Sequence, residues 1–573
     1  MSEKIKGSEA LMRCLVEEGV DRIFGYPGGA IMPVYDKIYD YSDRITHVLT
    51  RHEQGAIHAA QGYARSSGRV GVVVVTSGPG ATNLITGISD AMIDSTPLVV
   101  ITGQVGVSSL GTDAFQEADV VGITQPVSKW SVQVRRPQDI AKAMSRAFYI
   151  ASNGRPGPVV IDLTKDAQIG ECDWSYEKTD FIRSYNPKPE IRRDDLLSVA
   201  NLINSSKRPM ILSGHGVMIA EGEDALLALA EKGDIPVATT LLGLSTIPSD
   251  HRLNKGMLGM HGNLAPNINT NKADLLIAIG MRFDDRVTGD LAKYAPNARV
   301  VHIDIDKSEF NKLVKTDATI HGDAREAMEL LLPLVIEKER KDWLATFDRH
   351  DQVERERVIE ENIHPQSPTG PMKMGEVAFK VAEATGNKAI LVTDVGQNQM
   401  MSARYFRYSL PKSVITSGGL GTMGFGLPAA IGAKMGAPER TVCFFTGDGG
   451  IQMTVEEFGT IMQYRTAVKI IILNNNFLGN VRQWQALFFN RRFSQTPLLN
   501  PDFVMLANAY GIQAENVESR EQLDGAIKRM VESDGAYILN VNVDAEDMVF
   551  PMTPAGKPID EIMLNAEEYY KPV

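Results

Sequence analysis

The feature that most limits how this chain can fold is a series of short apolar runs, each followed by a turn and a helical pattern. These runs are residues 71–76 (GVVVVT), 98–102 (LVVIT), 209–213 (PMILS), 274–280 (DLLIAIG), 300–304 (VVHID), 442–446 (VCFFT) and 468–474 (VKIIILN). They lack the polar alternation of half-exposed strands and are typical of parallel strands covered on both faces by crossover helices. The chain is therefore predicted to be α/β, with doubly wound parallel sheets.

The 573 residues are too many for one hydrophobic core. We expect three doubly wound domains in series, at residues 1–173, 194–335 and 371–542, followed by a C-terminal tail at 543–573. A polar, proline-containing stretch near 174–193 is predicted to be a linker. A charged segment near 337–361 is most simply a solvated helix or linker, with an interaction helix as the alternative. The tail is rich in proline and charge and could close over a site.

Composition narrows the classes of function. Acidic residues outnumber basic ones, 71 to 59, for a net charge of -12. This balance argues against a nucleic-acid partner, but not against an anionic substrate, because a site is built from local groups. Cysteines 14, 172 and 443 are widely spaced, which suggests neither a disulfide framework nor a metal cluster. Without a long apolar run or a leader-like N-terminus, we expect a cytoplasmic protein with no membrane partner.

Two motifs at successive strand ends carry specific chemistry. Gly447-Asp448-Gly449 follows one predicted strand, and Asn474-Asn475-Asn476 follows the next. Ligands gather at the carboxyl ends of strands in open α/β sheets, so Asp448 and Asn475 should present oxygen ligands suited to Mg²⁺. The glycines let the backbone approach a diphosphate closely. A lone Gly-Asp-Gly usually marks a turn, but the two motifs together are the signature of thiamine-diphosphate enzymes.

A thiamine cofactor also needs a carboxyl group hydrogen-bonded to its aminopyrimidine ring. The candidate is Glu53, which begins a helical pattern within Arg51-His52-Glu53-Gln54. Taken alone, Glu53 is explained more simply as an acidic residue favoured by the helix dipole in a first turn.

Longer motifs resemble one family. Residues 25–30 (GYPGGA), 51–54 (RHEQ) and 77–83 (SGPGATN) are shared among thiamine enzymes. More specific are 111–119 (GTDAFQEAD), 282–289 (RFDDRVTG) and the segment around Trp484, with further matches at 154–158, 258–262 and 418–430. Over nearly its whole length the chain resembles the acetohydroxyacid synthases.

The resemblance implies that the domains are, in order, pyrimidine-binding, FAD-binding and diphosphate-binding. It assigns catalysis to Glu53, Gln116 and Lys165, and the substrate channel also to Phe115, Met260, Arg282 and Trp484. The implied metal set is Asp448, Asn475 and Phe477. The implied thiamine contacts are Tyr26, Pro79, Asn83, Gly396, Gln397, Asn398, Met423 and Gly449. The implied contacts of a structural FAD are Arg155, Gly214, Gly216, Arg282, Asp304 and Asp323.

Two positions depart from the family pattern. Many relatives have histidine where this chain has Asn398, although asparagine can still donate a hydrogen bond to a phosphate. Asn480 replaces a common methionine, so we expect a more polar acceptor pocket with a weaker preference between acceptors.

The implied activity is acetolactate synthesis: pyruvate is decarboxylated on thiamine diphosphate, and the two-carbon unit passes to pyruvate or 2-oxobutyrate. The products, 2-acetolactate and 2-aceto-2-hydroxybutyrate, serve branched-chain amino acid biosynthesis. The resemblance also implies a homodimer or a dimer of dimers with shared sites, and leaves open a small regulatory subunit. A flavin-using pyruvate oxidase is the nearest alternative, and another is glyoxylate carboligase, which lacks a glutamate at the position of Glu53. A non-catalytic scaffold would not need Glu53, Asp448 and Asn475 together.

Overall fold

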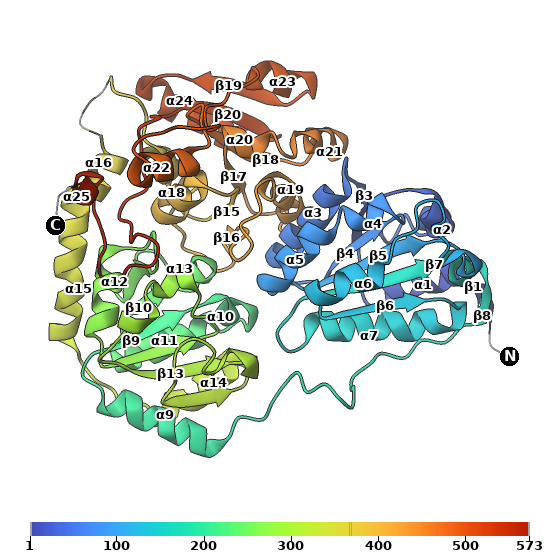
Figure 1. The fold of residues 1–573 in the computed structure, drawn as a ribbon, viewed down its shortest axis with the longest axis horizontal. Helices are drawn as coiled ribbons and strands as arrows, with labels where there is room; N and C mark the ends of the chain where they lie inside the picture. Colours follow the sequence, from blue (N-terminus) through green and yellow to red (C-terminus); the bar gives the residue numbers. More distant parts are fainter. Residues whose placement is uncertain (1–2, 366, 368, 571–573) are drawn as a thin grey trace.

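The computed structural model describes residues 3–570 apart from 366 and 368, and contains three six-stranded parallel sheets in series (Figure 1). The N-terminal sheet has the order β3-β2-β4-β5-β7-β6. Its strands are β2 (Arg22–Tyr26), β3 (Thr46–Leu49), β4 (Gly71–Val75), β5 (Leu98–Gln104), β6 (Trp130–Val134) and β7 (Pro158–Thr164). Its helices are α1 (Gly7–Glu17), α2 (Met32–Asp40), α3 (Glu53–Ser67), α4 (Pro79–Thr82), α5 (Ile85–Ile93), α6 (Val120–Thr124), α7 (Ile140–Ser152) and α8 (Lys165–Ile169).

The central sheet has the order β11-β10-β9-β12-β13-β14. Its strands are β9 (Pro209–Ser213), β10 (Val237–Thr239), β11 (Asn254–Met257), β12 (Leu275–Ile279), β13 (Arg299–Asp304) and β14 (Ala318–His321). Its helices are α9 (Arg193–Ser205), α10 (His215–Ile219), α11 (Glu223–Gly233), α12 (Leu264–Lys272), α13 (Asp285–Thr288) and α14 (Ala324–Leu331).

The C-terminal sheet has the order β16-β15-β17-β18-β20-β19. Its strands are β15 (Ile390–Thr393), β16 (Val414–Ile415), β17 (Val442–Gly447), β18 (Val468–Asn474), β19 (Gln513–Val517) and β20 (Tyr537–Asn542). Its helices are α17 (Met374–Ala384), α18 (Gln397–Tyr405), α19 (Gly426–Gly436), α20 (Asp448–Ile451), α21 (Phe458–Tyr464), α22 (Gly479–Phe488), α23 (Phe503–Ala509) and α24 (Arg520–Glu532).

Each sheet is apolar on both faces, as the uninterrupted runs predict. In β4, Val72 and Val74 join the core that includes α1 and α7, whereas Val73 and Val75 join the core that includes α3 and α5. A strand buried on both faces needs apolar side chains at every position, so its sequence cannot alternate. The expected fold class, α/β with three doubly wound domains in series, is confirmed.

The N- and C-terminal sheets share one topology. Numbered within their own domains, the strands of both follow the order 2-1-3-4-6-5, whereas the central sheet follows 3-2-1-4-5-6. The equivalent helices α3 and α19, each following the second strand of its domain, pack against each other. Gly62 lies against the backbone of Ala429, and Gly432 lies against the backbone of Ala59. This reciprocal contact is possible because neither glycine carries a Cβ.

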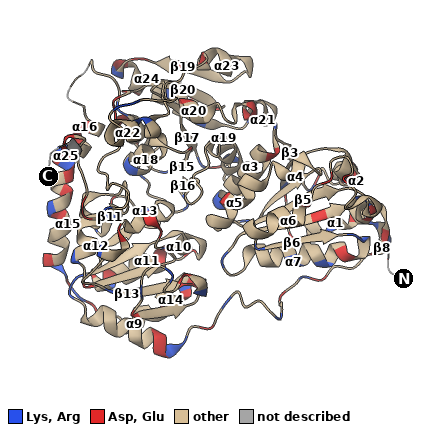
Figure 2. Ribbon diagram, viewed as in Figure 1, with Lys and Arg blue, Asp and Glu red and all other residues tan. Residues whose placement is uncertain are grey.

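Three segments join or cover the domains. A short sheet between β1 (Lys4–Lys6) and β8 (Glu171–Asp173) closes the N-terminal domain, and residues 174–192 then run to the central domain (Figure 1). The charged segment forms α15 (Lys341–Glu354), a π-helical turn (Arg355–Ile359) and α16 (Glu360–Ile363). Charges of both signs alternate along α15 (Figure 2), but Trp343 and Phe347 pack into the central core, so this helix is half-buried rather than fully solvated.

The chain after β20 crosses back over the central domain. The Thr553 amide donates to the Met260 carbonyl at 2.8 Å, and Pro558 pairs with Gly289. Helix α25 (Glu567–Tyr570) follows, and residues 571–573 of the expected tail lie outside the described residues. None of the helices in the described part of the chain has both the length and the apolar character needed to cross a bilayer.

Candidate active site

Two polar side chains meet at the carboxyl edge of the C-terminal sheet. Asp448 follows β17 and Asn475 follows the adjacent β18, and both are buried. The Oδ2 of Asp448 accepts a hydrogen bond from Asn500 at 2.7 Å, and burial raises the pKa of Asp448 to about 6. The Oδ1 of Asn475 accepts from the Phe477 amide at 3.1 Å. A buried carboxylate beside amide and carbonyl oxygens suits Mg²⁺, which needs few protein ligands.

Two helices begin beside these residues. Gly396, at φ +114°, precedes α18, and α22 begins at Gly479. A Cβ at Gly447 or Gly396 would lie 3.5 or 3.8 Å from the Nδ2 of Asn398. Helix N-termini and glycine backbone form ready anion sites, because their amides are free and no side chain blocks them. The two termini therefore form a cradle that fits a diphosphate.

The other predicted residues of this edge have different surroundings. The side chain of Gln397 donates from Nε2 to the Asp547 carbonyl at 3.0 Å, and its Oε1 accepts from the Nδ2 of Asn475 at 3.3 Å. Gly449 packs toward Leu478 and Leu498, because a Cβ there would stand 2.8 and 3.2 Å from their methyl groups. The Oδ1 of Asn398 is buried and has no hydrogen-bond partner in the described structure. Phe477 has an apolar side chain, so only its carbonyl oxygen could bind a metal ion.

The N-terminal sheet presents a second group of predicted residues at its own carboxyl edge. Tyr26 ends β2, Pro79 follows β4 and Lys165 follows β7. Glu53 is the first residue of α3, and its Oε2 accepts a hydrogen bond from Asn83 at 3.0 Å. The amide of Asn83 fixes the carboxyl group while the rest of Glu53 stays half-buried.

Phe115 and Gln116 lie on the loop beside Gly78. A Cβ at Gly78, which has φ +56°, would lie 2.9 Å from the Gln116 carbonyl oxygen. Phe115 is 89% exposed, and Tyr26 and Lys165 are exposed as well. Phe115 and Tyr26 thus leave aromatic surface open to solvent on this domain.

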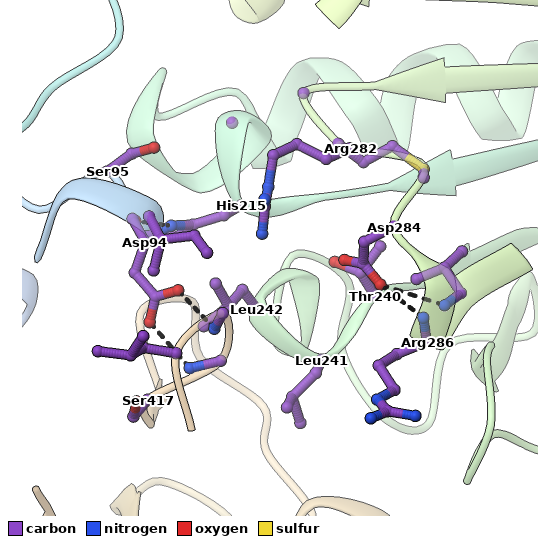
Figure 3. A pocket seen from close by; sticks show the side chains of 18 of the residues that line it. Asp94, Ser95, His215, Thr240, Leu241, Leu242, Arg282, Asp284, Arg286 and Ser417 are labelled. Atoms are coloured by element: carbon purple, nitrogen blue, oxygen red, sulfur yellow. Dashed lines mark hydrogen bonds between the residues drawn. The ribbon is translucent and has the colours of Figure 1, made fainter. Parts of the chain in front are cut away.

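One cavity of about 740 Å³ joins the central domain to both of its neighbours. Its wall includes Arg155, Gly216, Met260, Arg282, Asp304, Asp323, Gly396, Asn480 and Trp484. In the central strand order, the reversal lies between β9 and β12, and the cavity opens there, where dinucleotides bind in sheets of this order. The side chain of Arg282 reaches into it toward His215 and Asp94 (Figure 3).

Several predicted contacts of the central domain are placed by the local fold. Arg155 is held by Ser95 at 2.9 Å and by Glu309 at 3.1 Å. Asp304 ends β13, and Asp323 caps α14. Gly214 is not part of the cavity wall; a Cβ on it would stand 2.3 Å from the Gly280 carbonyl, so its role is close backbone packing.

Sequence reasoning missed three buried carboxylates. Asp394 accepts from the amides of Gly424 and Gly426, which follow Met423. Glu457 accepts from the amides of Arg51 and His52, which precede α3, and burial raises its pKa to about 7. Asp94 binds the loop before Met423 from the N-terminal domain. The position of Asp394 directly after an apolar run was a usable signal, but the partners of the other two lie on distant segments.

Comparison with known families matches the chain in three successive parts. Residues 5–123 match the thiamine pyrophosphate enzyme N-terminal TPP binding domain, 196–331 the central domain, and 394–541 the C-terminal TPP binding domain. The acetolactate synthase large subunit of Lactococcus lactis is 44% identical, over 98% of this chain and 97% of its own. The acetolactate synthase isozyme 3 large subunit of Escherichia coli is 41% identical, over 99% and 100%. The mitochondrial catalytic subunit of Saccharomyces cerevisiae is 42% identical, over 98% and 84%.

Proposed function

The chain belongs to the acetolactate synthase large-subunit family of thiamine-diphosphate enzymes, and from this premise we propose that it decarboxylates pyruvate and joins the two-carbon unit to a second 2-oxo acid. The observation that carries the proposal is the cavity whose wall includes Met260, Arg282 and Trp484 and extends to Gly396. In this cavity Arg282 supplies a cation for the carboxylate of an oxo acid, and Met260 and Trp484 supply apolar surface for its short side chain. Both lie in the same wall as Gly396, at the edge that fits a diphosphate.

Thiamine diphosphate with Mg²⁺ fits the C-terminal edge. The buried carboxylate of Asp448, the amide oxygen of Asn475 and the carbonyl of Phe477 would hold the metal ion. Gly396, Gln397 and Asn398 would bind the diphosphate at the start of α18. When bound, the thiazolium ring serves as the electron sink for decarboxylation. Met423 would place an apolar side chain against the cofactor.

The N-terminal edge would handle the proton. Glu53, oriented by Asn83, would exchange a proton with a nitrogen of the aminopyrimidine, since a carboxyl group can both donate and accept one. Tyr26 and Pro79 would line the ring pocket. Gln116 and Lys165 would place polar groups near the reacting carbonyl, and Phe115 would help exclude water.

Arg282 is the natural partner of the second substrate. Its planar guanidinium can bind a carboxylate through two parallel hydrogen bonds. Burial raises the pKa of the neighbouring Asp284, although the positive charge of Arg282 acts to lower it. The Oδ1 of Asp284 accepts hydrogen bonds from the backbone amides of Arg286 and Val287. Trp484 and Met260 would contact the aliphatic part of pyruvate or 2-oxobutyrate.

FAD fits the central part of the cavity as a structural group. Carboxylates at the ends of parallel strands bind ribose hydroxyls, and Asp304, at the end of β13, and Asp323, at the start of α14, would take this role. Arg155, Gly216 and Arg282 line the same space. The proposed condensation has no net oxidation or reduction, so the flavin would stabilise the walls rather than exchange electrons.

A second copy of the chain would complete each site. Glu53 accepts a hydrogen bond from Asn83, and Asp448 accepts one from Asn500, so each carboxyl group is bound within its own domain. Apolar side chains remain exposed beside both groups, including Phe115 on one edge and Met453 and Leu499 on the other. We expect a homodimer or dimer of dimers in which Glu53 of one subunit faces Asp448 of another. Mixing inactive Glu53→Gln and Asp448→Asn subunits should then restore activity, and no recovery despite demonstrated subunit exchange would contradict a shared site.

The deciding experiment is incubation with pyruvate, thiamine diphosphate, Mg²⁺ and FAD, followed by an acetolactate assay. Acetolactate formation that requires thiamine diphosphate supports the proposal. Oxygen consumption with acetate or acetyl phosphate as the product would instead show a flavin-using oxidase, and Glu53→Gln serves as the inactive control. Because the relatives are named large or catalytic subunits, a smaller regulatory chain should be sought by adding the small subunit of a relative to the same assay.

A further inference from the structure

A loop at residues 416–423, here called the Met423 loop, lies where the three domains meet. Gly418 packs against Leu242 of the central domain, because a Cβ there would be 2.6 Å from its side chain. Gly419 packs against Ile93 of the N-terminal domain in the same way, at 2.8 Å. Residues 417–421 of the loop form part of the cavity wall, and the loop ends at Met423. It is therefore shared by the cavity and the proposed thiamine edge.

Asp94 holds one half of this loop from the N-terminal domain. Its two carboxylate oxygens accept hydrogen bonds from the amides of Gly418 and Gly419, both at 2.8 Å (Figure 3). Arg65 pairs with the same carboxylate at 2.9 Å and also donates to the Thr416 carbonyl at 2.6 Å. His215 of α10 donates from Nδ1 to the Asp94 carbonyl at 3.0 Å, which ties the junction to the central domain.

Asp90, one turn earlier on α5, holds the other half. Its Oδ1 accepts from the hydroxyls of Ser417 and Thr422, the latter at 3.2 Å, and the Thr422 amide donates to Ser417 Oγ at 2.8 Å. Asp90 is fully buried and lies outside the cavity wall, and its Oδ2 has no hydrogen-bond partner in the described structure. Burial, with the nearby Asp94, raises the pKa of Asp90 to about 6. Its Oδ1 serves the loop as a hydrogen-bond acceptor.

Resting on the proposed function, we propose that Asp90 and Asp94 are positioning residues that hold the Met423 loop in the form the thiamine site requires, while the flavin in the cavity supports the same loop through residues 417–421. The loop contains Gly418, Gly419 and Gly421, and glycine backbone loses the most entropy on ordering. Whichever contact orders the loop first lowers the cost of binding the next ligand. Loss of the Asp90 contacts should therefore be corrected, in part, by filling the cavity.

The test measures the dissociation constant of thiamine diphosphate at saturating Mg²⁺ by calorimetry on the full chain, with and without saturating FAD. Asp90→Ala removes two hydrogen bonds and should raise this constant about ten-fold without FAD. Adding FAD should bring it within about three-fold of the unmodified protein. Asp90→Asn keeps an acceptor oxygen for both hydroxyls and should stay within about two-fold.

Two further variants keep the outcome decisive. Thr422→Val removes one of the two loop hydroxyls that donate to Asp90 and should shift the constant in the same direction by a smaller factor, with the same recovery on adding FAD, even if Asp90→Ala fails to fold. Asp162→Ala is the matched control: Asp162 is buried in the same domain with a pKa also raised to about 6 by burial, but it bonds to Thr102, Gln104 and Gln133. An unchanged constant in Asp90→Ala, or an increase that FAD does not reduce, overturns the inference. Failure of the unmodified chain to bind thiamine diphosphate overturns the proposed function instead.

Discussion

Replacing Gly432 with alanine should destabilise the protein, although the same change at most interior helix positions is stabilising. Alanine normally gains about 0.5–1 kcal/mol over glycine in a helix. At 432, however, the new Cβ would lie 1.8 Å from the Ala59 carbonyl oxygen and 2.9 Å from the Tyr63 amide nitrogen. Because non-bonded heavy atoms need about 3.5 Å, α19 would have to retreat from α3 by roughly 1.5 Å. Overpacking of this kind costs about 1–3 kcal/mol and outweighs the helix gain.

Urea unfolding of the cofactor-free protein at fixed concentration would measure this effect. Gly525→Ala is the matched control, because its Cβ on α24 would approach only the mobile end of Arg529, at 3.3 Å, and the variant should gain stability. Gly62→Ala should match Gly432→Ala, since its Cβ would lie 1.9 Å from the Ala429 oxygen. The double variant should lose less than both single losses together, because one separation of the helices accommodates both methyl groups. A Gly432→Ala midpoint at or above that of Gly525→Ala would refute the close packing.

Three other predictions concern single side chains. Because the pKa of Glu457 is raised, the folded state between pH 4.5 and 7 holds a proton that the unfolded state has released. The contribution of Glu457 to stability is therefore present below pH 4.5 and is lost as the pH rises toward 7, by roughly 3 kcal/mol. Glu457→Gln should flatten the plot of unfolding free energy against pH over that range, and an unchanged slope would exclude Glu457 as its source. Trp484→Leu should still form acetolactate but lose about ten-fold in preference for 2-oxobutyrate, scored by product ratio in a competition of the two acceptors; an equal ratio would remove Trp484 from the selection of acceptors. Glu53→Gln should keep the fold but slow hydrogen–deuterium exchange at the cofactor C2, followed by NMR, and exchange at the normal rate would rule out the role of this carboxyl group.

The sequence predicts best those features whose cause is local. The run that forms β18 is recognisable because a strand buried on both faces must be apolar throughout, and its predicted bounds are those of the structure. Asp448 and Asn475 could be placed together because adjacent parallel strands end at the same edge. The two-residue strand β16 offers no such run, and only its neighbours in the sheet define it.

The contacts between domains could not be predicted from the sequence, for a physical reason. Asp94 and Gly418 are 324 positions apart, and no periodicity in either segment indicates that a carboxylate meets two glycine amides. Glu457 could not be distinguished from a solvated glutamate, because the amides that it accepts from precede α3 in another domain. Likewise, the exposure of Phe115 follows from the surface around it rather than from its own sequence motif.

The reciprocal packing of α3 and α19 gives a single chain a symmetry of its own. Ala59 and Gly62 on one helix meet Gly432 and Ala429 on the other, so the contact maps onto itself when the helices are exchanged. The separation along the chain that relates Gly62 to Gly432 also relates Glu53 to Met423. With two sheets of identical strand order behind them, these residues occupy corresponding places in two copies of one scaffold. The fold offers the same position twice, and the sequence fills it once with a carboxyl group and once with a thioether.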